Sequence, residues 1–310
     1  MTYPQRPLAG CIVNLAVSES DDSTQRGFPS AQVNRVTLQI VAALFGQGAS
    51  LIFGHDWRED GVMEAVYGFA RQVQSPIPLS PAQAEAENEP LLRNLVPWPD
   101  TPYLSGPELE QLSSTLRVEP AGLPRELQAV EADARRADPD NPLYRYVRAR
   151  GLTFLRRRLN STSHARFCIG GRRSGYAGRY PGIIEEAFLA VTDNKPLYVA
   201  GFLGGAAEQV MLAFEGNAMP DDFCRPSPLE SLYAAPPTQE RDLATRNDRV
   251  MDRTAVWNAF RETGRERLAR NNALTVDENN ELFHTSVIER AIELVLIGLS
   301  RLQLAKNNQA

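Results

Sequence analysis

The sequence is poor in cysteine and histidine. Only Cys11, Cys168 and Cys224 occur among its 310 residues, and no two of them have the CxxC spacing. Cys11 and Cys168 lie in apolar runs typical of strands, so we predict reduced core thiols, as in a cytoplasmic protein. The three histidines form no HxxxH motif, which argues against a dedicated metal site. A GxSxG motif is also absent, which argues against a Ser-His-Asp nucleophile.

Long hydrophobic runs and net positive charge are also lacking. No stretch of about eighteen uncharged apolar residues occurs, and the first residues, MTYPQRPLAG, do not resemble an export signal. The formal net charge is −5 and the pI is about 5.4, so no basic field is present to hold a nucleic-acid backbone. We therefore expect a cytoplasmic protein with no membrane or nucleic acid as partner and no bound cofactor or metal.

What the sequence does contain is an alternation of short apolar runs with helical patterns. The strand-like runs are 11–17, 48–54, 91–98, 165–171 and 195–201. The helical patterns lie at 31–45, 58–73, 141–160 and 182–192. Parallel strands need crossover helices, and both sheet faces must then be covered. The pattern predicts an α/β fold, a Rossmann-like and mainly parallel sheet with helices on both faces.

Two regions depart from this alternation. Prolines crowd a segment from about 75 to 140, which we expect to be an insertion with short helices over 106–136. Beyond 216 the pattern is helical and ends in an apolar helix at about 284–306, buried against the sheet or against a second copy. The predicted organisation is a ligand-binding domain over 1–215 and a helical extension over 216–310. Within 141–160 we expect six arginines to face mostly outward.

Four of the expected strands are followed at once by loops of unusual content. These loops read SESDD (18–22), GHDWRED (54–60), GGRRSGYAGRYPG (170–182) and GFLGGAAE (201–208). In an open parallel sheet the carboxyl ends of the strands share one edge, and ligands bind there. The sequence therefore predicts one crevice that collects all four loops.

The loop at 170–182 combines flexible backbone with positive charge. Its glycines allow backbone amides to approach a ligand closely, and the helix that begins near Pro181 presents free N–H groups. Guanidinium groups match phosphate oxygens. We interpret the loop as an anion site, most simply for a phosphate; turn glycines and solvated arginines are the alternative. The residues concerned are Gly170, Gly171, Arg172, Arg173, Gly178, Arg179 and Gly182.

Two adjacent glutamates follow in the first turn of that helix. Stabilisation of the helix dipole explains one of them, but not two. Glu185 or Glu186 could hold ribose hydroxyls, or assist departure of a base or attack of water at an anomeric carbon. Tyr176 could stack on a base or ribose, or be an exposed loop residue.

Further candidates lie in the other three loops. Ser18 and Glu19 could bond a ligand or act as turn and cap residues, and Asp56 is a weaker candidate of the same kind. Gly204 and Gly205 precede a helix, where they could contact a pyrophosphate or permit tight packing of helix on sheet.

Four segments in this order resemble the SLOG superfamily: IVNLAVSES, GASLIFGHD, CIGGRRSGYAGRYPGIIEEAFLA and KPLYVAGFLGGAAE. That superfamily includes Smf-type DNA-uptake proteins, lonely-guy phosphoribohydrolases, the N-terminal domains of melastatin-type TRP channels and Thoeris sensor domains. The resemblance implies a Rossmann-like sheet with a nucleotide-type ligand at the strand tips. Gly182 and Glu186 match part of the hydrolase signature PGGxGTxxE, whereas Ile183 replaces its threonine.

Three functional hypotheses follow. The first is a module that binds and senses a nucleotide-derived small molecule, ADP-ribose-like or cyclic, in a stress or antiphage pathway. It would signal as a homo-oligomer or through an effector protein partner. The second is an N-glycosidic hydrolase of nucleoside 5′-phosphates or NAD-like dinucleotides, with Glu186 as the principal carboxylate. The third is a scaffold whose crevice has lost its ligand.

Overall fold

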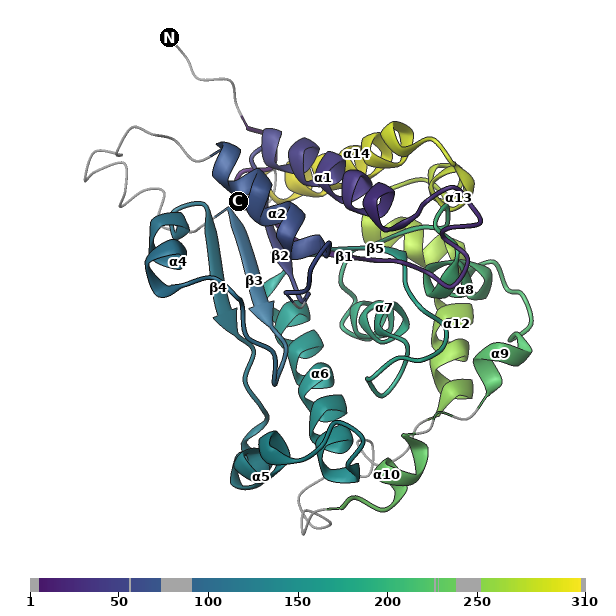
Figure 1. Ribbon diagram of the computed structural model, residues 1–310. Helices are drawn as coiled ribbons and strands as arrows, with labels where there is room; N and C mark the ends of the chain where they lie inside the picture. Colours follow the sequence, from purple (N-terminus) through teal and green to yellow (C-terminus); the bar gives the residue numbers. More distant parts are fainter. Residues whose placement is uncertain are drawn as a thin grey trace.

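The structure, a computed structural model, is built on a parallel sheet with helices on both faces (Figure 1). It describes residues 6–55, 57–73, 91–225, 227, 229–237 and 252–307. The strands are β1 (Ile12–Ser18), β2 (Ser50–Phe53), β3 (Leu92–Val96), β4 (Leu116–Pro120), β5 (Ala165–Gly170) and β6 (Leu197–Ala200). They form one six-stranded sheet in the order β4-β3-β2-β1-β5-β6, with every neighbouring pair parallel. The predicted α/β, Rossmann-like fold class is confirmed.

The two central strands, β1 and β5, mark the point where the direction of winding reverses. From β1 the chain continues outward through β2, β3 and β4, and it returns to the other side of β1 as β5. All of β5 and the middle of β1 are buried, which explains their nearly continuous apolar sequences. The register pairs Ser18 with Gly170, so both strands end side by side. A crevice forms at such a reversal point because the following helices diverge to opposite faces.

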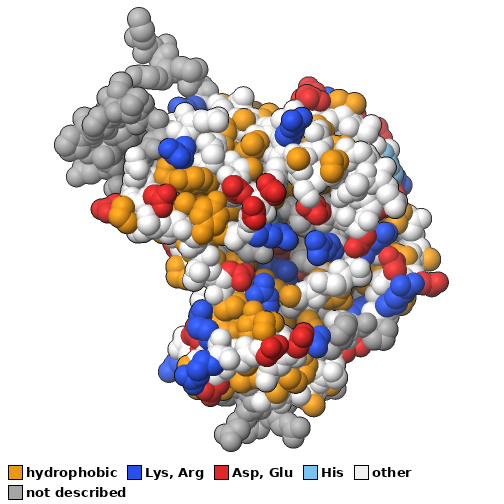
Figure 2. Space-filling model, in the orientation of Figure 1, with side chains coloured by type: hydrophobic (Ala, Val, Ile, Leu, Met, Phe, Trp, Pro, Cys, Tyr) orange, Lys and Arg blue, Asp and Glu red, His pale blue; other side chains and the backbone are white. Residues whose placement is uncertain are grey.

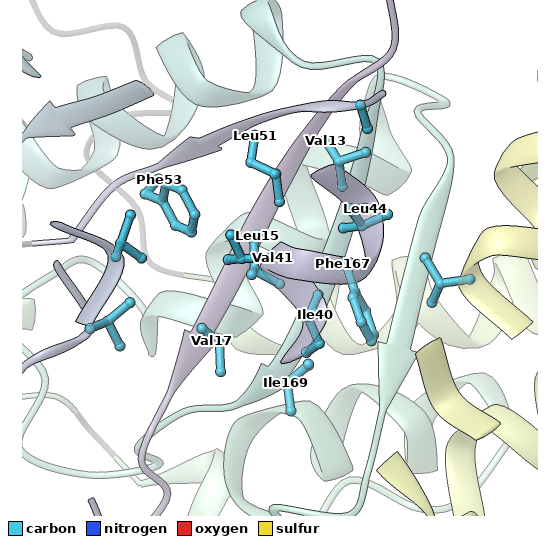
Figure 3. Close-up of a cluster of buried hydrophobic side chains, with 14 of the residues drawn as sticks. Val13, Leu15, Val17, Ile40, Val41, Leu44, Leu51, Phe53, Phe167 and Ile169 are labelled. Carbon is cyan, nitrogen blue, oxygen red and sulfur yellow. The ribbon is translucent and has the colours of Figure 1, made fainter. Parts of the chain in front are cut away.

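One face of the sheet is covered by α1 (Ser30–Gly46), α2 (Val62–Val73) and α14 (Ile288–Asn307) (Figure 1). The core on this face forms because alternate residues of β1 meet apolar residues of α1 at helical spacing. Figure 3 shows that contact between strand and helix side chains. The residues drawn there include Val13, Leu15, Val17, Ile40, Val41 and Leu44.

The opposite face is covered by α6 (Pro142–Thr162), α7 (Gly182–Thr192) and α8 (Gly205–Phe214), with α12 (Arg253–Asn272) outside them. The alternate residues of the central strands, such as Ala16 and Cys168, pack into this second core. Aromatic contact joins its layers, since the Phe214 and Phe260 rings lie 5.5 Å apart. Helices beyond residue 216 thus share a core with the sheet; the predicted domain boundary at 215 stays a prediction.

The segment predicted as an insertion supplies an edge of the sheet in its described part. It contains β3, α4 (Gly106–Leu112), β4, a 3-10 helix (Arg125–Val130) and α5 (Glu131–Arg136). Short helices occur over 106–136 as expected, but the strand β4 also lies within that range and was not predicted. This strand, LRVEP, is an edge strand with four of its five residues at least partly exposed, and this mixed sequence does not show the alternation typical of a strand.

The helices at the C-terminal end pack against the molecule rather than standing apart. Short helices α9 (Asp221–Cys224) and α10 (Glu230–Ala234) lead to α12, and α13 (Val276–His284) precedes α14. One side of α14 is buried in the same core as α1, which is one of the two predicted environments for this helix. Within the described part of the chain, no helix has both the length and the apolarity needed to cross a bilayer.

Candidate functional site

A cavity of about 380 Å³ lies at the carboxyl ends of β1 and β2, beside the start of the loop that follows β5. We call it the strand-end cavity. Ser18 at the end of β1 and Glu19 just after it line this cavity, as do Gly54 and His55 after β2 and Gly171 after β5. The loops after these three strands therefore meet at one crevice, as predicted, whereas the fourth loop of that prediction, GFLGGAAE after β6, does not line it. Figure 2 shows a hollowed region on one face of the molecule where cationic and acidic side chains gather.

Three described helices begin at this cavity. The starts of α1, α2 and α7 contribute to its wall. In α1 and α7 the residue before the helix is a proline, Pro29 or Pro181, with no side-chain cap for the first-turn N–H groups. Uncapped N–H groups and the positive end of the helix dipole favour an anion. Lining residues from these helix starts are Ser30, Val33, Asn34, Gly61, Val62, Gly182 and Ile183.

Gly170 and Gly171 have a structural reason to be glycine. Both have positive φ, and a Cβ at either position would clash, with the Ser18 carbonyl oxygen or with Ile183. Because the backbones at the ends of β1 and β5 lie close together, the Gly171 N–H donates to the Ser18 carbonyl at 3.0 Å. These two glycines therefore hold the ends of β1 and β5 together, and Gly171 also lines the cavity.

Gly178 and Gly182 make room for a buried guanidinium. A Cβ at Gly178 would collide with Nη1 of Arg156, and one at Gly182 would lie 2.9 Å from its Nη2. Arg156 comes from α6 and donates to Oε2 of Glu185 at 2.5 Å, and Thr153 donates to Oε1 at 2.5 Å. Glu185 is buried against α6 by these contacts and is not among the cavity-lining residues.

Glu186, in contrast, does line the cavity. Its carboxylate forms an ion pair with Nη1 of Arg166 on β5, and its Oε1 lies 3.9 Å from Nε of Arg156. Two arginines thus fix the carboxylate at the cavity wall, and its side chain is only 14% exposed. Of the two adjacent glutamates, Glu186 is the one placed to meet a ligand.

The three arginines predicted for one phosphate site go to different places. Arg172 lines the strand-end cavity. Arg173 turns toward three aspartates, with its Nε 3.6 Å from Oδ2 of Asp21 and 3.5 Å from Oδ2 of Asp222. Arg179 stacks on the rings of Tyr180 and Tyr233 at 5.4 and 5.6 Å.

Charges at the cavity divide into paired and unpaired groups. Glu186 is paired with arginines, and Arg148 is paired with Asp100 at 3.3 Å. Within the described residues, neither Arg172 nor Glu19 has an ion pair or a side-chain hydrogen bond. Among the described residues of the cavity wall, the exposed Arg172 and the partly buried Glu19 therefore have unused bonding capacity, as do the exposed carboxylates of Glu59 and Asp60.

Arg148 and Arg156 line the cavity, although the helical pattern of 141–160 predicted that its arginines face mostly outward. Of the six arginines in 141–160, Arg150 and Arg156 are buried and Arg157 is exposed, so the expected outward orientation is wrong. The reason is pairing, because carboxylates on other elements meet these guanidinium groups: the partly exposed Glu126 pairs with Arg150, and the buried Glu185 pairs with Arg156. Helical periodicity alone gives no sign of such partners.

Tyr176 lies where three cavities meet. It contributes to the strand-end cavity and to two others, and its hydroxyl accepts a hydrogen bond from Nη2 of Arg253 at 3.2 Å. The ring is half-buried, a position from which it can contact a ligand.

The remaining candidates do not line the strand-end cavity or are not described. Gly204 and Gly205 pack tightly: a Cβ at Gly205 would clash with the Gly171 carbonyl, and the Ala206 N–H donates to that carbonyl at 2.8 Å. This contact favours the packing interpretation of the glycine pair. Asp56 lies outside the described residues. The described His, Cys, Asp and Glu side chains include no group of three or more arranged to hold a metal ion.

Comparison with protein families identifies the class. The family model described as SLOG cluster2 matches residues 7–282, and the chain therefore belongs to this family. Membership indicates nucleotide-related binding or a glycosidase-type function. The match extends through α12 and into α13, well beyond the strands that carry the sequence motifs. No curated protein and no solved structure matches the chain.

Proposed function

We propose that the protein binds a nucleotide-derived small molecule in the strand-end cavity. The observation that supports this most is the pair of unused groups, Arg172 and Glu19, beside the uncapped starts of α1 and α7. The helix starts and Arg172 favour phosphate oxygens. Glu19 would repel a bare phosphate, but a carboxylate accepts hydrogen bonds from sugar hydroxyls. A phosphorylated sugar uses both groups, whereas inorganic phosphate uses only one.

Binding can be tested by titration calorimetry with AMP, ADP-ribose and NAD. Arg172→Ala should weaken binding by about tenfold, because a charge-assisted hydrogen bond contributes about 1.5 kcal/mol or more. Arg173→Ala changes the neighbouring residue of the same loop and is the matched control, since Arg173 faces aspartates outside the cavity. Equal losses in both variants, or no binding of any probe by the native protein, would contradict the proposed site.

A second candidate function is cleavage of an N-glycosidic bond. The specific observation in its favour is that Glu186 lines the cavity with its carboxylate oriented by Arg156 and Arg166. An oriented carboxylate could direct a water toward an anomeric carbon. Base released from AMP or NAD by the native protein and not by Glu186→Gln would support hydrolysis. Binding without release supports a sensor.

For a sensor we further propose a role in stress or antiphage signalling, with an output through self-association or an effector protein. Support for this comes from the SLOG family and from apolar side chains that remain exposed, Val287 before α14 and Leu304 near its end. Light scattering with and without ADP-ribose measures whether the mass in solution changes on binding.

A further inference from the structure

We infer that the ligand has two arms, and that its second arm occupies a separate compartment beside the strand-end cavity. The inference rests on the proposed function and specifies the class of ligand. The second compartment, which we call the side cavity, has a volume of about 530 Å³. It lies between the start of α6, the loop after β5, and the segment before α10.

The two cavities share a wall. Arg148, Gly175, Tyr176 and Ala177 line both of them. A molecule bound at the strand ends therefore has a second space directly beside it, past the tip of the loop. A single nucleoside phosphate would leave the side cavity to solvent, whereas a longer ligand would fill both.

Arg148 provides a fixed cation at this junction. Its Nη1 donates to Oδ1 of Asp100 at 3.3 Å and to the hydroxyl of Tyr144 at 3.2 Å, and its Nη2 donates to Oδ2 of Asp100 at 3.4 Å. These bonds use only some of the five N–H groups of a guanidinium. The remaining donors are held in place where a linking phosphate would pass.

Two tyrosines give the side cavity an aromatic character. The ring of Tyr144 packs against Trp98, with centroids 5.6 Å apart, and its hydroxyl is bonded to Arg148. Tyr176 is held through its own hydroxyl by Arg253. Rings that are already fixed lose little entropy when a planar group stacks on them, and such stacking is worth about 1–3 kcal/mol per base.

Arg145 completes the compartment. It lies three residues before Arg148 on α6, lines the side cavity and, within the described residues, has no ion pair or side-chain hydrogen bond. Each compartment therefore contains one unused guanidinium, Arg172 in the first and Arg145 in the second. The matching ligand has hydrogen-bond acceptors at both ends, as in two nucleoside-type halves joined by a pyrophosphate.

The test compares AMP with ADP-ribose and NAD by titration calorimetry of the full chain. We expect at least one two-armed probe to bind about tenfold or more tightly than AMP, and Arg145→Ala to remove most of that difference while AMP affinity changes less than about twofold. NAD carries less negative charge than AMP, so a non-local electrostatic effect of Arg145→Ala would weaken AMP more. Arg267→Ala, an exposed position on α12, is the control for loss of one positive charge.

The outcomes separate this inference from the proposed function. AMP binding as tight as that of both longer probes, or equal weakening of AMP and NAD by Arg145→Ala, overturns the two-armed ligand and leaves the strand-end site intact. Failure of all three probes to bind overturns both.

Discussion

Arg156 connects the parts of the site that are buried. Its guanidinium contacts Glu185 at 2.5 Å, lies 3.9 Å from the Glu186 carboxylate, and occupies space left by Gly178 and Gly182. Its side chain is 10% exposed, and that of Glu185 is 4% exposed. Charges at this depth are tolerated only when each has a partner, because removal from water is costly. Arg156 thus determines both the shape of the loop and the orientation of the glutamates.

Replacing Arg156 should therefore be strongly destabilising. Arg156→Met leaves Glu185 buried with Thr153 as its remaining hydrogen-bond donor, so we expect a loss of about 3–5 kcal/mol in the free energy of unfolding by urea. Adding Glu185→Gln should recover part of this loss because the buried charge is removed. In the control, Arg136→Ala breaks an exposed pair with Asp133 and should cost less than about 1 kcal/mol. Similar losses in the two single variants would contradict the buried network.

The sequence identified candidate ligand-binding residues in the loop after β5, but it did not predict the direction of each side chain. Arg172, Arg173 and Arg179 look equivalent in the sequence, and only Arg172 reaches the strand-end cavity. What separates them is non-local: Asp21 and Asp222 attract Arg173, and Tyr233 stacks on Arg179. The ligand roles predicted for Arg173 and Arg179 stay predictions that this placement does not favour.

Among the helices and strands, the sequence predicted most accurately those strands whose residues are nearly all buried. Four apolar runs became β1, β2, β5 and β6, and the helix expected at 182–192 is α7 with those bounds. The edge strand β4 was missed because partly exposed strands admit charged residues such as Arg117 and Glu119. The crevice was predictable because strand ends in a parallel sheet meet at one edge, a rule of topology that needs no knowledge of side-chain contacts.

The attachment of α14 to α13 depends in part on one ion pair. Arg301 of α14 donates to Oε2 of Glu278 at 2.6 Å, and this bond, assisted by the N-cap Thr275, lowers the pKa of Glu278 from 4.5 to about 2. The carboxyl has a lower pKa folded than unfolded. Its stabilising contribution is therefore complete above about pH 4.5 and disappears as the pH falls toward 2.

Glu278→Gln removes the charge and keeps an acceptor for the backbone N–H of Thr275. We expect this variant to be less stable than the native protein at pH 7, by about 1 kcal/mol because the pair is partly screened by solvent. The difference should shrink to near zero by about pH 2. Glu289→Gln changes an exposed glutamate of α14 and is the control. If the difference in stability between Glu278→Gln and the native protein did not change with pH, the stabilising ion pair between Glu278 and Arg301 would be contradicted.

At the scale of the whole protein, the topology of the sheet determines where the helix starts and the two cavities lie. The reversal of winding between β1 and β5 opens the crevice, and α1, α2 and α7 direct their starts toward it. On the other side of the loop tip, α6 carries Arg145 and Arg148 along the side cavity. The net charge of −5 is compatible with this arrangement, because Arg148 and Glu186 are paired and the unused cations, Arg145 and Arg172, are local.

A crystal structure of the protein grown with ADP-ribose would test the proposed binding site without any inference from variants. We expect density for the ligand in the strand-end cavity, with phosphate oxygens at the starts of α1 and α7 and within hydrogen-bonding distance of Arg172. A ligand bound elsewhere on the surface, or one in the strand-end cavity that turns its phosphates away from Arg172 and both helix starts, would contradict the proposed binding site.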